Sequence, residues 1–282
     1  MAVHDRGVTK ILLTGATGSV GRHVAADLLA KGLDVRVVVR DPETAGLPAG
    51  IEVMHGDLVD PESLSAALVG VDAVFLLWPF FSAGGASDVV DAIARNARRV
   101  VYLSAEAAAH DPESVWAIVE RRIEESGLEW TFLRPTGFAK NTLEWADQVR
   151  IGVVRGPYGE AARSLIDERD IAAVAVRALT EGGHTGKTYV LTGPATVTQA
   201  EQVRIIGEAI GRPVIWEEQS RADARPDLVE LFGGESYADG ALDTWAGFVT
   251  RPERVTATVE EITGVTARSF RQWATAHAED FP

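Results

Sequence analysis

The sequence predicts an α/β fold, a doubly wound parallel sheet with a small, mostly helical C-terminal lobe. Two observations carry this prediction. In the first half of the chain, short runs that are apolar on both faces alternate with stretches of helical periodicity, which is typical of a parallel sheet covered by helices on two sides. In addition, a glycine-rich turn follows the first apolar run and precedes the first helical stretch.

Strand-like and helix-like segments follow one another regularly up to about residue 195. We expect strands at 10–14, 35–39, 51–54, 74–77, 100–103, 130–133, 164–166 and 188–191, and helices after residue 20 and at 61–69, 87–96, 112–126 and 170–180. Beyond this point the pattern is mostly helical and begins with a capping box formed by Thr198 and Glu201. Four aromatic side chains at helical spacing near the C-terminus predict core packing: Phe270, Trp273, His277 and Phe281.

The composition is that of an ordinary globular protein. Of the 282 residues, 46% are hydrophobic and 24% are charged, enough to bury a sizeable core. The net charge of −14 opposes binding to nucleic acid or an anionic membrane, because phosphate groups repel an acidic surface. The longest apolar stretch, 73–81, is far shorter than the roughly 20 residues of a membrane-spanning helix. The absence of cysteine excludes disulfides and thiol chemistry, and we expect a cytoplasmic protein.

The glycine-rich turn reads Thr14-Gly15-Ala16-Thr17-Gly18-Ser19-Val20-Gly21. Its T-G-x-x-G-x-x-G spacing lies between a strand and a helix near the start of the chain, the setting of a dinucleotide-binding turn. Glycine permits a tight turn and lets a pyrophosphate approach the free N–H groups of the helix N-terminus. We therefore predict a Rossmann-type core whose pyrophosphate contacts come from Gly15, Thr17, Gly18, Ser19, Val20 and Gly21.

The end of the second strand predicts which dinucleotide binds. Arg40 is the first residue after the apolar run, where a side chain meets the adenosine ribose. A guanidinium suits the 2′-phosphate of NADP, whereas a carboxylate accepts from the free 2′-hydroxyl of NAD. Arg40 thus favours NADP(H). Asp41 leaves NAD(H) as the alternative, because a shift of the turn by one residue would place its carboxylate at the ribose.

Further candidates stand at the carboxyl ends of the strands. Asp57 is placed to accept from the adenine amino group beside Leu58, with capping of the next helix as its alternative role. Trp78 is expected to wall the cofactor, and Phe80 and Phe81 to line an apolar substrate pocket, with plain packing as the alternative. The predicted cofactor contacts also include Leu77, Ser104 and Pro135. The predicted substrate pocket also includes Trp116 and Phe138.

Several segments recur together in one known group of proteins. They are the glycine-rich turn, Val38-Val39-Arg40-Asp41, His55-Gly56-Asp57-Leu58, Val100-Val101-Tyr102-Leu103-Ser104, the run from Ser126 to Pro135, Asp170-Ile171-Ala172 and Leu191-Thr192-Gly193-Pro194. In these segments the chain resembles the atypical short-chain dehydrogenase/reductases, specifically the NmrA-like NAD(P)H-binding group. The resemblance implies a Rossmann core, a small C-terminal lobe over the nicotinamide and a substrate cleft. Its members include reductases of quinones and other small molecules, and cofactor-binding regulators without known turnover.

With this resemblance the chain divides into three stretches. Residues 9–150 are expected to form the dinucleotide-binding core, 151–195 the remaining core strands and helix interleaved with the substrate lobe, and 196–282 the C-terminal substrate lobe. The wider superfamily uses a serine and a Tyr-x-x-x-Lys pair on the helix after the fifth strand. Here the resemblance places Ala105 at the serine position, and Trp116 and Glu120 at the spacing of the pair. The usual proton donor is therefore missing, and we expect Trp116 to wall the pocket and Glu120 to serve structure.

Two side chains are candidates for the missing chemistry. His110 lies in the loop after the fifth strand, and histidine is the usual general acid near neutral pH; a loop histidine beside a helix-capping Asp111 is the alternative. Lys140 follows the sixth strand, in the segment that the group uses to contact nicotinamide and substrate. Its amine would polarise a carbonyl or bind an acidic substrate, unless it is simply solvated. No metal-ligand or nucleotide-hydrolysis motif is present.

These observations predict an NADP(H)-dependent reductase of a small, apolar or aromatic carbonyl, quinone or enone. Two alternatives stay open. One is an NAD(P)H-binding sensor or regulatory partner without redox turnover. The other is an isomerase or cyclase on the same scaffold, which the missing tyrosine suggests.

Overall fold

The computed structural model describes residues 9–281, which form two compact units. Unit 1 contains the described chain up to Pro135 together with Glu168–Leu191 and Thr258–Gly264. Unit 2 contains Thr136–Asp167, Thr192–Ala257 and the chain from Val265 onward. The chain thus passes from one unit to the other several times, and residues 136–150 lie in unit 2.

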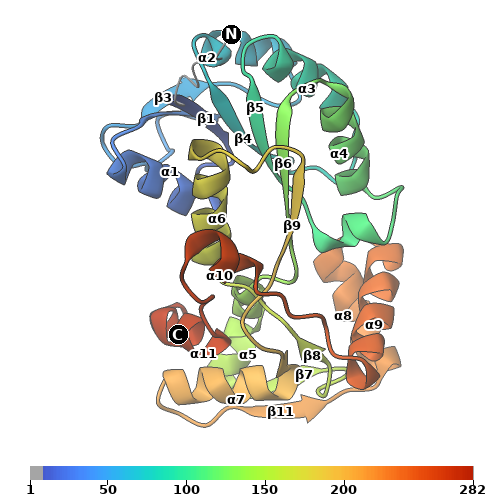
Figure 1. Cartoon of the computed structure of the whole chain (residues 1–282). Helices are drawn as coiled ribbons and strands as arrows, with labels where there is room; N and C mark the ends of the chain where they lie inside the picture. Colours follow the sequence, from blue (N-terminus) through green and yellow to red (C-terminus); the bar gives the residue numbers. More distant parts are fainter. Residues whose placement is uncertain (1–8, 282) are drawn as a thin grey trace. The chain divides into compact units, whose positions relative to one another are not determined.

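Unit 1 is built on a seven-stranded parallel sheet with the order β3-β2-β1-β4-β5-β6-β9 (Figure 1). The order reverses between β1 and β4, and in open sheets of this kind ligands bind at the carboxyl ends of the strands beside such a reversal. The strands are β1 (Lys10–Thr14), β2 (Asp34–Val39), β3 (Glu52–His55), β4 (Ala73–Leu77), β5 (Arg99–Leu103), β6 (Glu129–Pro135) and β9 (Lys187–Leu191).

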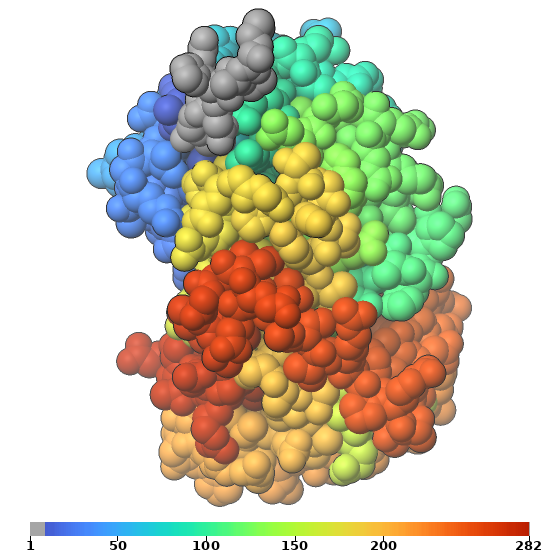
Figure 2. All heavy atoms as spheres, viewed as in Figure 1, coloured from blue at the N-terminus to red at the C-terminus, as the bar shows by residue number. Residues whose placement is uncertain are grey.

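Helices cover both faces of this sheet, which is why its strands are apolar on both sides. On one face α10 lies against α6 and β9, although it comes much later in sequence. Figure 2 shows the orange-red α10 segment lying on the yellow segment of α6 and β9. This face carries α1 (Gly21–Ala30), α6 (Glu168–Thr180) and α10 (Thr258–Thr263). The other carries the 3₁₀ helix η1 (Pro61–Leu64), α2 (Ser65–Leu68), α3 (Ala86–Ala94) and α4 (Val115–Glu125), with the 3₁₀ helix η2 (Glu106–Ala109) before α4.

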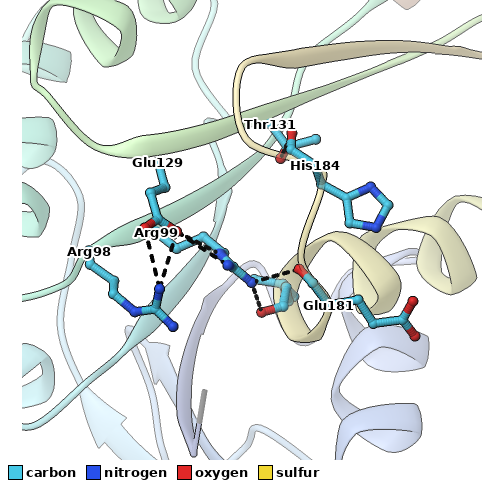
Figure 3. A network of polar contacts seen from close by, with 7 residues as sticks. Arg98, Arg99, Glu129, Thr131, Glu181 and His184 are labelled. Carbon is cyan, nitrogen blue, oxygen red and sulfur yellow. Dashed lines mark hydrogen bonds and ion pairs between the residues drawn. The ribbon is translucent and has the colours of Figure 1, made fainter. Parts of the chain in front are cut away.

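A buried arginine fastens the amino edge of the sheet to the end of a helix. Arg99 is 8% exposed, and its Nη1 donates to the carbonyl oxygens of Leu179 and Glu181, each at 3.0 Å, where α6 ends (Figure 3). Its Nε and Nη2 pair with Glu129, which also pairs with Arg98. The cation therefore satisfies carbonyls that the helix leaves without partners.

The same arrangement recurs on the second strand. Arg36 is 7% exposed and donates from Nη1 to the carbonyl oxygens of Ala67 and Val69, at 2.6 and 2.9 Å, where α2 ends. Its Nε and Nη2 pair with Glu52. In both cases the carboxylate is the register partner of the arginine on the next strand, Glu52 for Arg36 and Glu129 for Arg99. The sheet thus carries two equivalent ion-pair clamps at its amino edge.

Unit 2 combines helices with two small two-stranded sheets. One sheet is parallel and consists of β7 (Val153–Gly156) and β11 (Ile215–Glu218); the other is antiparallel and consists of β8 (Ala162–Arg163) and β10 (Val197–Thr198). Its core includes Trp273, which is fully buried. The helices are η3 (Ala139–Trp145), α5 (Ala146–Ile151), α7 (Gln199–Ala209), α8 (Arg221–Phe232), α9 (Glu235–Thr250), α11 (Phe270–Ala276) and η4 (Ala278–Asp280).

Most of the predicted architecture is confirmed. The parallel sheet, the capping box of Thr198 and Glu201 and the mostly helical C-terminal region are all present. The aromatic stripe packs in the core as predicted, and the ring of His277 stacks on Trp273 at 4.4 Å between centroids. The strand predicted at 164–166 is wrong: Ile166 makes only an isolated bridge, to Phe138, and the nearby strand is β8.

The helix predicted at 112–126 begins later than expected. α4 starts at Val115 because the Ser114 hydroxyl caps it, accepting from the N–H of Ala117 at 3.3 Å. Asp111 is therefore not the helix cap; its carboxylate accepts instead from the N–H of Glu113.

Candidate cofactor and active site

The glycine-rich turn connects β1 to α1 and leaves no room for larger residues at two of its glycines. Gly15 has φ +67°, and a Cβ there would lie 2.3 Å from Leu77 Cδ2. A Cβ at Gly21 would lie 2.2 Å from the carbonyl oxygen of Gly15. The Thr14 hydroxyl fixes the turn against β4, accepting from the N–H of Leu77 at 2.7 Å and donating to its carbonyl at 3.1 Å. The turn is thus rigidly placed at the carboxyl edge of the sheet.

The turn offers donors for an anionic ligand. Among the described residues, the N–H groups of Thr17, Ser19 and Val20 make no hydrogen bond. The side chain of Arg22 donates to the carbonyl oxygens of Thr17 and Gly18, at 3.1 and 3.2 Å, so that these two acceptors of the turn are already occupied. The first turn of α1 contains no acidic residue and no side-chain cap. These are the properties of a pyrophosphate cradle, and the predicted residues fit the diphosphate of NAD(P)H.

The two candidate ribose residues after β2 differ in their availability. Asp41 is engaged in its own loop, where it accepts from the N–H of Glu43 at 3.1 Å and from the hydroxyl of Thr44 at 2.8 Å. Arg40 is exposed and makes no hydrogen bond or ion pair within the part of the chain that the structure describes. The guanidinium is therefore available to a ligand, whereas the carboxylate already has partners.

The predicted adenine residue follows β3. One carboxylate oxygen of Asp57 accepts from the N–H of Val59 at 3.1 Å, and its backbone N–H donates to the Ser63 hydroxyl at 2.9 Å. Asp57 therefore closes its own turn and does not cap η1, whose cap position is Asp60. Leu58 next to it is buried.

The aromatic residues after β4 separate into buried and exposed ones. Trp78 is 5% exposed, and its indole N–H donates to the carbonyl oxygen of Ser82 at 2.8 Å. The half-buried Phe80 packs edge-on against Trp78, with ring centroids 5.0 Å apart. Phe81 is 74% exposed. Leu77 is half-buried and lies against the glycine-rich turn. Trp78 belongs to the hydrophobic core next to it, and Phe80 packs against that core.

A buried carboxylate connects the ends of β5 and β6. Glu120 on α4 is 4% exposed and accepts from the hydroxyl of Ser104 at 2.5 Å. Arg134 on β6 donates to both of its oxygens, from Nε at 2.9 Å and from Nη2 at 2.5 Å. The bond to Glu120 raises the pKa of Arg134, so that the guanidinium stays charged. Both carboxylate oxygens of Glu120 are thus engaged by donors of the protein itself, which agrees with a structural role and not with contact to a substrate.

Tyr102 lies beneath this pair and is also excluded as an acid. It is fully buried, its ring contacts Phe132 edge-on, and its hydroxyl has no hydrogen-bond partner among the described residues. Burial and, after it, the negative charge of Glu120 raise the pKa of the Tyr102 hydroxyl. The phenol therefore keeps its proton at neutral pH.

The two further candidates in unit 1 lie just after η2 and in the first turn of α4. His110 follows η2 and has a side chain that is 72% exposed; its Nε2 lies 2.8 Å from Glu106 Oε1. Trp116 is in the first turn of α4 and is half-buried against the core. Pro135 ends β6 and is buried.

The remaining candidates, Phe138 and Lys140, belong to unit 2. Phe138 stands before η3 and is bridged to Ile166, while Lys140 lies within η3. Both are half-buried, and Lys140 has no ion pair or hydrogen bond in the described chain. The structure therefore brings the cofactor candidates together along one sheet edge of unit 1 and places these two residues in the other unit.

Comparison with known proteins decides the family. The sequence profile described as NAD(P)H-binding matches residues 15–182, which include the turn, β2 to β6 and α6. The chain belongs to this NAD(P)H-binding family. Its cofactor is accordingly NAD(P)H, as the sequence predicts, and the fold is that of the NmrA-like atypical reductases.

Its similarity to known proteins covers nearly the whole chain. It is 40% identical to a (4-alkanoyl-5-oxo-2,5-dihydrofuran-3-yl)methyl phosphate reductase of Streptomyces griseus, over 96% of this chain and 99% of the relative. An NAD(P)H azoreductase of Xenophilus azovorans is 35% identical, again over 96% and 99%. A solved NADPH-dependent quinone oxidoreductase of Escherichia coli superposes with a TM-score of 0.79 at 25% identity, over 94% of this chain and 98% of that one.

Sequence reasoning missed three contributors to this site. Thr14 and Arg22 position the turn, and Arg134 pairs with Glu120. An arginine one residue before the proline that ends a strand was the available signal for Arg134. Among residues 9–281 no helix is long and apolar enough to cross a membrane.

Proposed function

We propose that this family member is an NADPH-dependent reductase of a small, electron-poor carbonyl compound, either a quinone or an enone. The observation that carries the choice of cofactor is the contrast after β2, where Arg40 has no partner in the described chain and Asp41 is engaged by its own loop. When bound, NADPH supplies a hydride. Relatives whose names describe reduction of a furanone phosphate, of azo compounds and of quinones support this class of reaction.

The residues of unit 1 divide the work of binding. The N–H groups of Thr17, Ser19 and Val20 would hold the pyrophosphate, and Arg40 the 2′-phosphate. The second carboxylate oxygen of Asp57 accepts no hydrogen bond within the described residues, which suits an adenine amino group. Leu77, Trp78, Ser104 and Pro135 would form the floor under the nicotinamide. The protein supplies orientation, and the cofactor supplies the reactive atom.

The remaining candidates are assigned to the substrate. His110 is proposed as the proton donor, because Glu106 Oε1 lies 2.8 Å from its Nε2 and orients the ring. Phe80, Phe81 and Trp116 of unit 1 would contact an apolar substrate, and Phe138 of unit 2 is proposed separately as a further apolar contact. Lys140, without an ion-pair partner in the described chain, would attract an acidic substituent such as a phosphate ester.

A turnover assay tests the proposal directly. Purified protein is mixed with NADPH and a panel of quinones, enones and a furanone phosphate, and the loss of NADPH absorbance is followed. We expect oxidation of NADPH with at least one of these acceptors. Tight binding of NADPH without oxidation across the panel would instead favour a cofactor-binding regulator, and conversion of a substrate without loss of NADPH would favour an isomerase.

Replacing Arg40 with alanine should weaken NADPH selectively. A charge-assisted contact with the 2′-phosphate contributes on the order of 1.5–3 kcal/mol, so the Kd for NADPH should rise roughly 10- to 150-fold. Binding of NADH should change little, and fluorescence titration measures both. Arg95→Ala is the matched control, because Arg95 is also exposed but follows α3 at the amino edge. Equal losses for both cofactors would make Arg40 a structural residue.

Replacing His110 with alanine tests the proton donor. A well-placed general acid contributes roughly 10²- to 10⁴-fold to the rate, and we expect His110→Ala to lower kcat by an amount in this range with NADPH affinity unchanged. Glu106→Gln should cause a smaller loss, and Trp116→Phe should act on KM. A near-neutral His110→Ala variant would assign the proton to solvent.

A further inference from the structure

The ion pair of Arg134 and Glu120 joins the carboxyl end of β6 to α4. Tyr102 and Ser104 at the end of β5 and Phe132 and Arg134 on β6 alternate along their strands, so that all four project to the face that α4 covers. Glu120 reaches them from the second turn of α4. The positive charge of the pair thus belongs to Arg134 on β6, and the Glu120 carboxylate on α4 holds it in place.

The guanidinium of Arg134 is only partly used by this pair. Its Nε and Nη2 donate to Glu120, whereas its other terminal nitrogen, Nη1, makes no hydrogen bond or ion pair within residues 9–281. The side chain is 20% exposed and belongs to the penultimate residue of β6, at the carboxyl edge. Two N–H donors on a fixed cation therefore remain for a ligand at this edge.

Neither neighbour can perform the same task. Ser104 donates its proton to Glu120, and the Tyr102 hydroxyl is fully buried beneath the pair. Trp116 has a donor N–H without charge. Arg134 is therefore the one cation within this group of described residues that can meet a negative charge formed on a substrate.

We propose that Arg134 is a catalytic residue that binds the negatively charged oxygen formed on the substrate, and that Glu120 is the residue that positions it. This rests on the proposed reduction of a quinone or enone. Arrival of a hydride, with its two electrons, leaves one negative charge on a quinone oxygen; a proton from His110 then gives the hydroquinone, and water reprotonates His110. A preorganised guanidinium stabilises such a charge without rearrangement, which is the largest single contribution in many enzymes.

The binding of 4-nitrophenol tests this role without turnover. Its anion resembles the hydroquinone anion, and protein loaded with NADP⁺ is titrated with it while the phenolate absorbance is followed. We expect the bound phenol to ionise at a pH about one unit lower than in water, as a nearby positive charge requires. Arg134→Met should abolish this effect and lower kcat for a quinone roughly 10²- to 10³-fold, the loss typical of removing one oxyanion donor.

Because Arg134→Met leaves the Glu120 carboxylate buried without its cation, the double variant E120Q/R134M is the decisive one. It removes both charges, and buried pairs replaced together are often tolerated without loss of stability. Its thermal midpoint and NADPH affinity verify the fold, and Arg98→Met at the opposite edge is the control. Normal ionisation of the phenol in wild-type protein, or a shift that persists in the double variant, would overturn the assignment. A shift without turnover on any acceptor would retain Arg134 as an anion site and refute the proposed reductase instead.

Discussion

Replacing Gly18 with valine is expected to abolish tight binding of NADPH and to leave the fold intact. Gly18 has no positive φ, and a Cβ there would meet only the carbonyl oxygen of Gly15, at 3.1 Å. The valine can therefore be accommodated by a small movement of the turn. Its methyl groups would, however, lie where the pyrophosphate must approach the N–H groups of Thr17, Ser19 and Val20.

The expected loss is large because several contacts fail together. Hydrogen bonds to a charged group contribute about 1.5–3 kcal/mol each, so that losing two of them weakens binding more than about 100-fold. Isothermal calorimetry with NADPH measures the affinity, and thermal unfolding without cofactor verifies the fold. Gly182→Val is the matched control, since a Cβ there has nothing within 4 Å. If Gly18→Val bound NADPH like the parent protein, the pyrophosphate would have to lie elsewhere.

Valine at Gly21 would give a different result. A Cβ there would lie 2.2 Å from a backbone oxygen of Gly15, so the turn itself would have to break. We therefore expect Gly21→Val to lose the folded protein. Gly21 is required for packing of the turn, whereas Gly18 is required for binding of the ligand. The two variants therefore divide one motif into its two physical functions.

The sheet could be predicted from sequence because its central strands β1, β2, β4 and β5 are buried on both faces. Each predicted strand from 10–14 to 130–133 lies within two residues of the observed bounds. The strand predicted at 164–166 is wrong, although Leu165 and Ile166 are buried as in a strand. An apolar run indicates burial, but it does not show whether the backbone pairs with a neighbouring strand, and here only an isolated bridge forms. The strands β7 and β11 escaped prediction because they are short and partly exposed; Ile215, for example, is 59% exposed.

The candidate site could be predicted for residues whose role depends on their position within one strand–turn–helix unit. The glycines and Arg40 stand at fixed distances from strand ends, and one strand–turn–helix unit positions them. Arg134 and Glu120 are 14 residues apart, and only the pairing of β5 with β6 and the packing of α4 bring them together. The sequence predicts a structural role for Glu120, but it contains no sign of which cation would meet it.

The arginine clamps show a signal that sequence reasoning did not use. Arg36 interrupts an otherwise apolar strand, and a charged residue inside a buried strand requires a partner. Glu52 and Glu129, each at the start of the following strand of the sheet, supply it. An arginine in an apolar run, followed one strand later by a glutamate, therefore predicts such a clamp.

Replacing Arg99 with methionine should destabilise the protein strongly and leave the cofactor site unaffected in the folded fraction. The change removes the donors to the carbonyl oxygens of Leu179 and Glu181 and one partner of Glu129. Each unsatisfied buried acceptor costs about 1–3 kcal/mol. Glu129 adds less, because its side chain is 38% exposed and retains Arg98. We therefore expect unfolding to become easier by about 2–5 kcal/mol.

Urea denaturation of Arg99→Met and of Arg98→Met provides the comparison. Arg98 pairs with the same carboxylate, but its side chain is 39% exposed and caps neither of those carbonyls, so its loss should cost no more than about 1 kcal/mol. Arg36→Met should behave like Arg99→Met, because it leaves the carbonyls of Ala67 and Val69 without their donor. Equal small losses in all three variants would mean that the ion pairs, and not the capped helix ends, are what these arginines provide. The difference arises because a charge pair near solvent is screened, whereas a buried carbonyl without a donor is not.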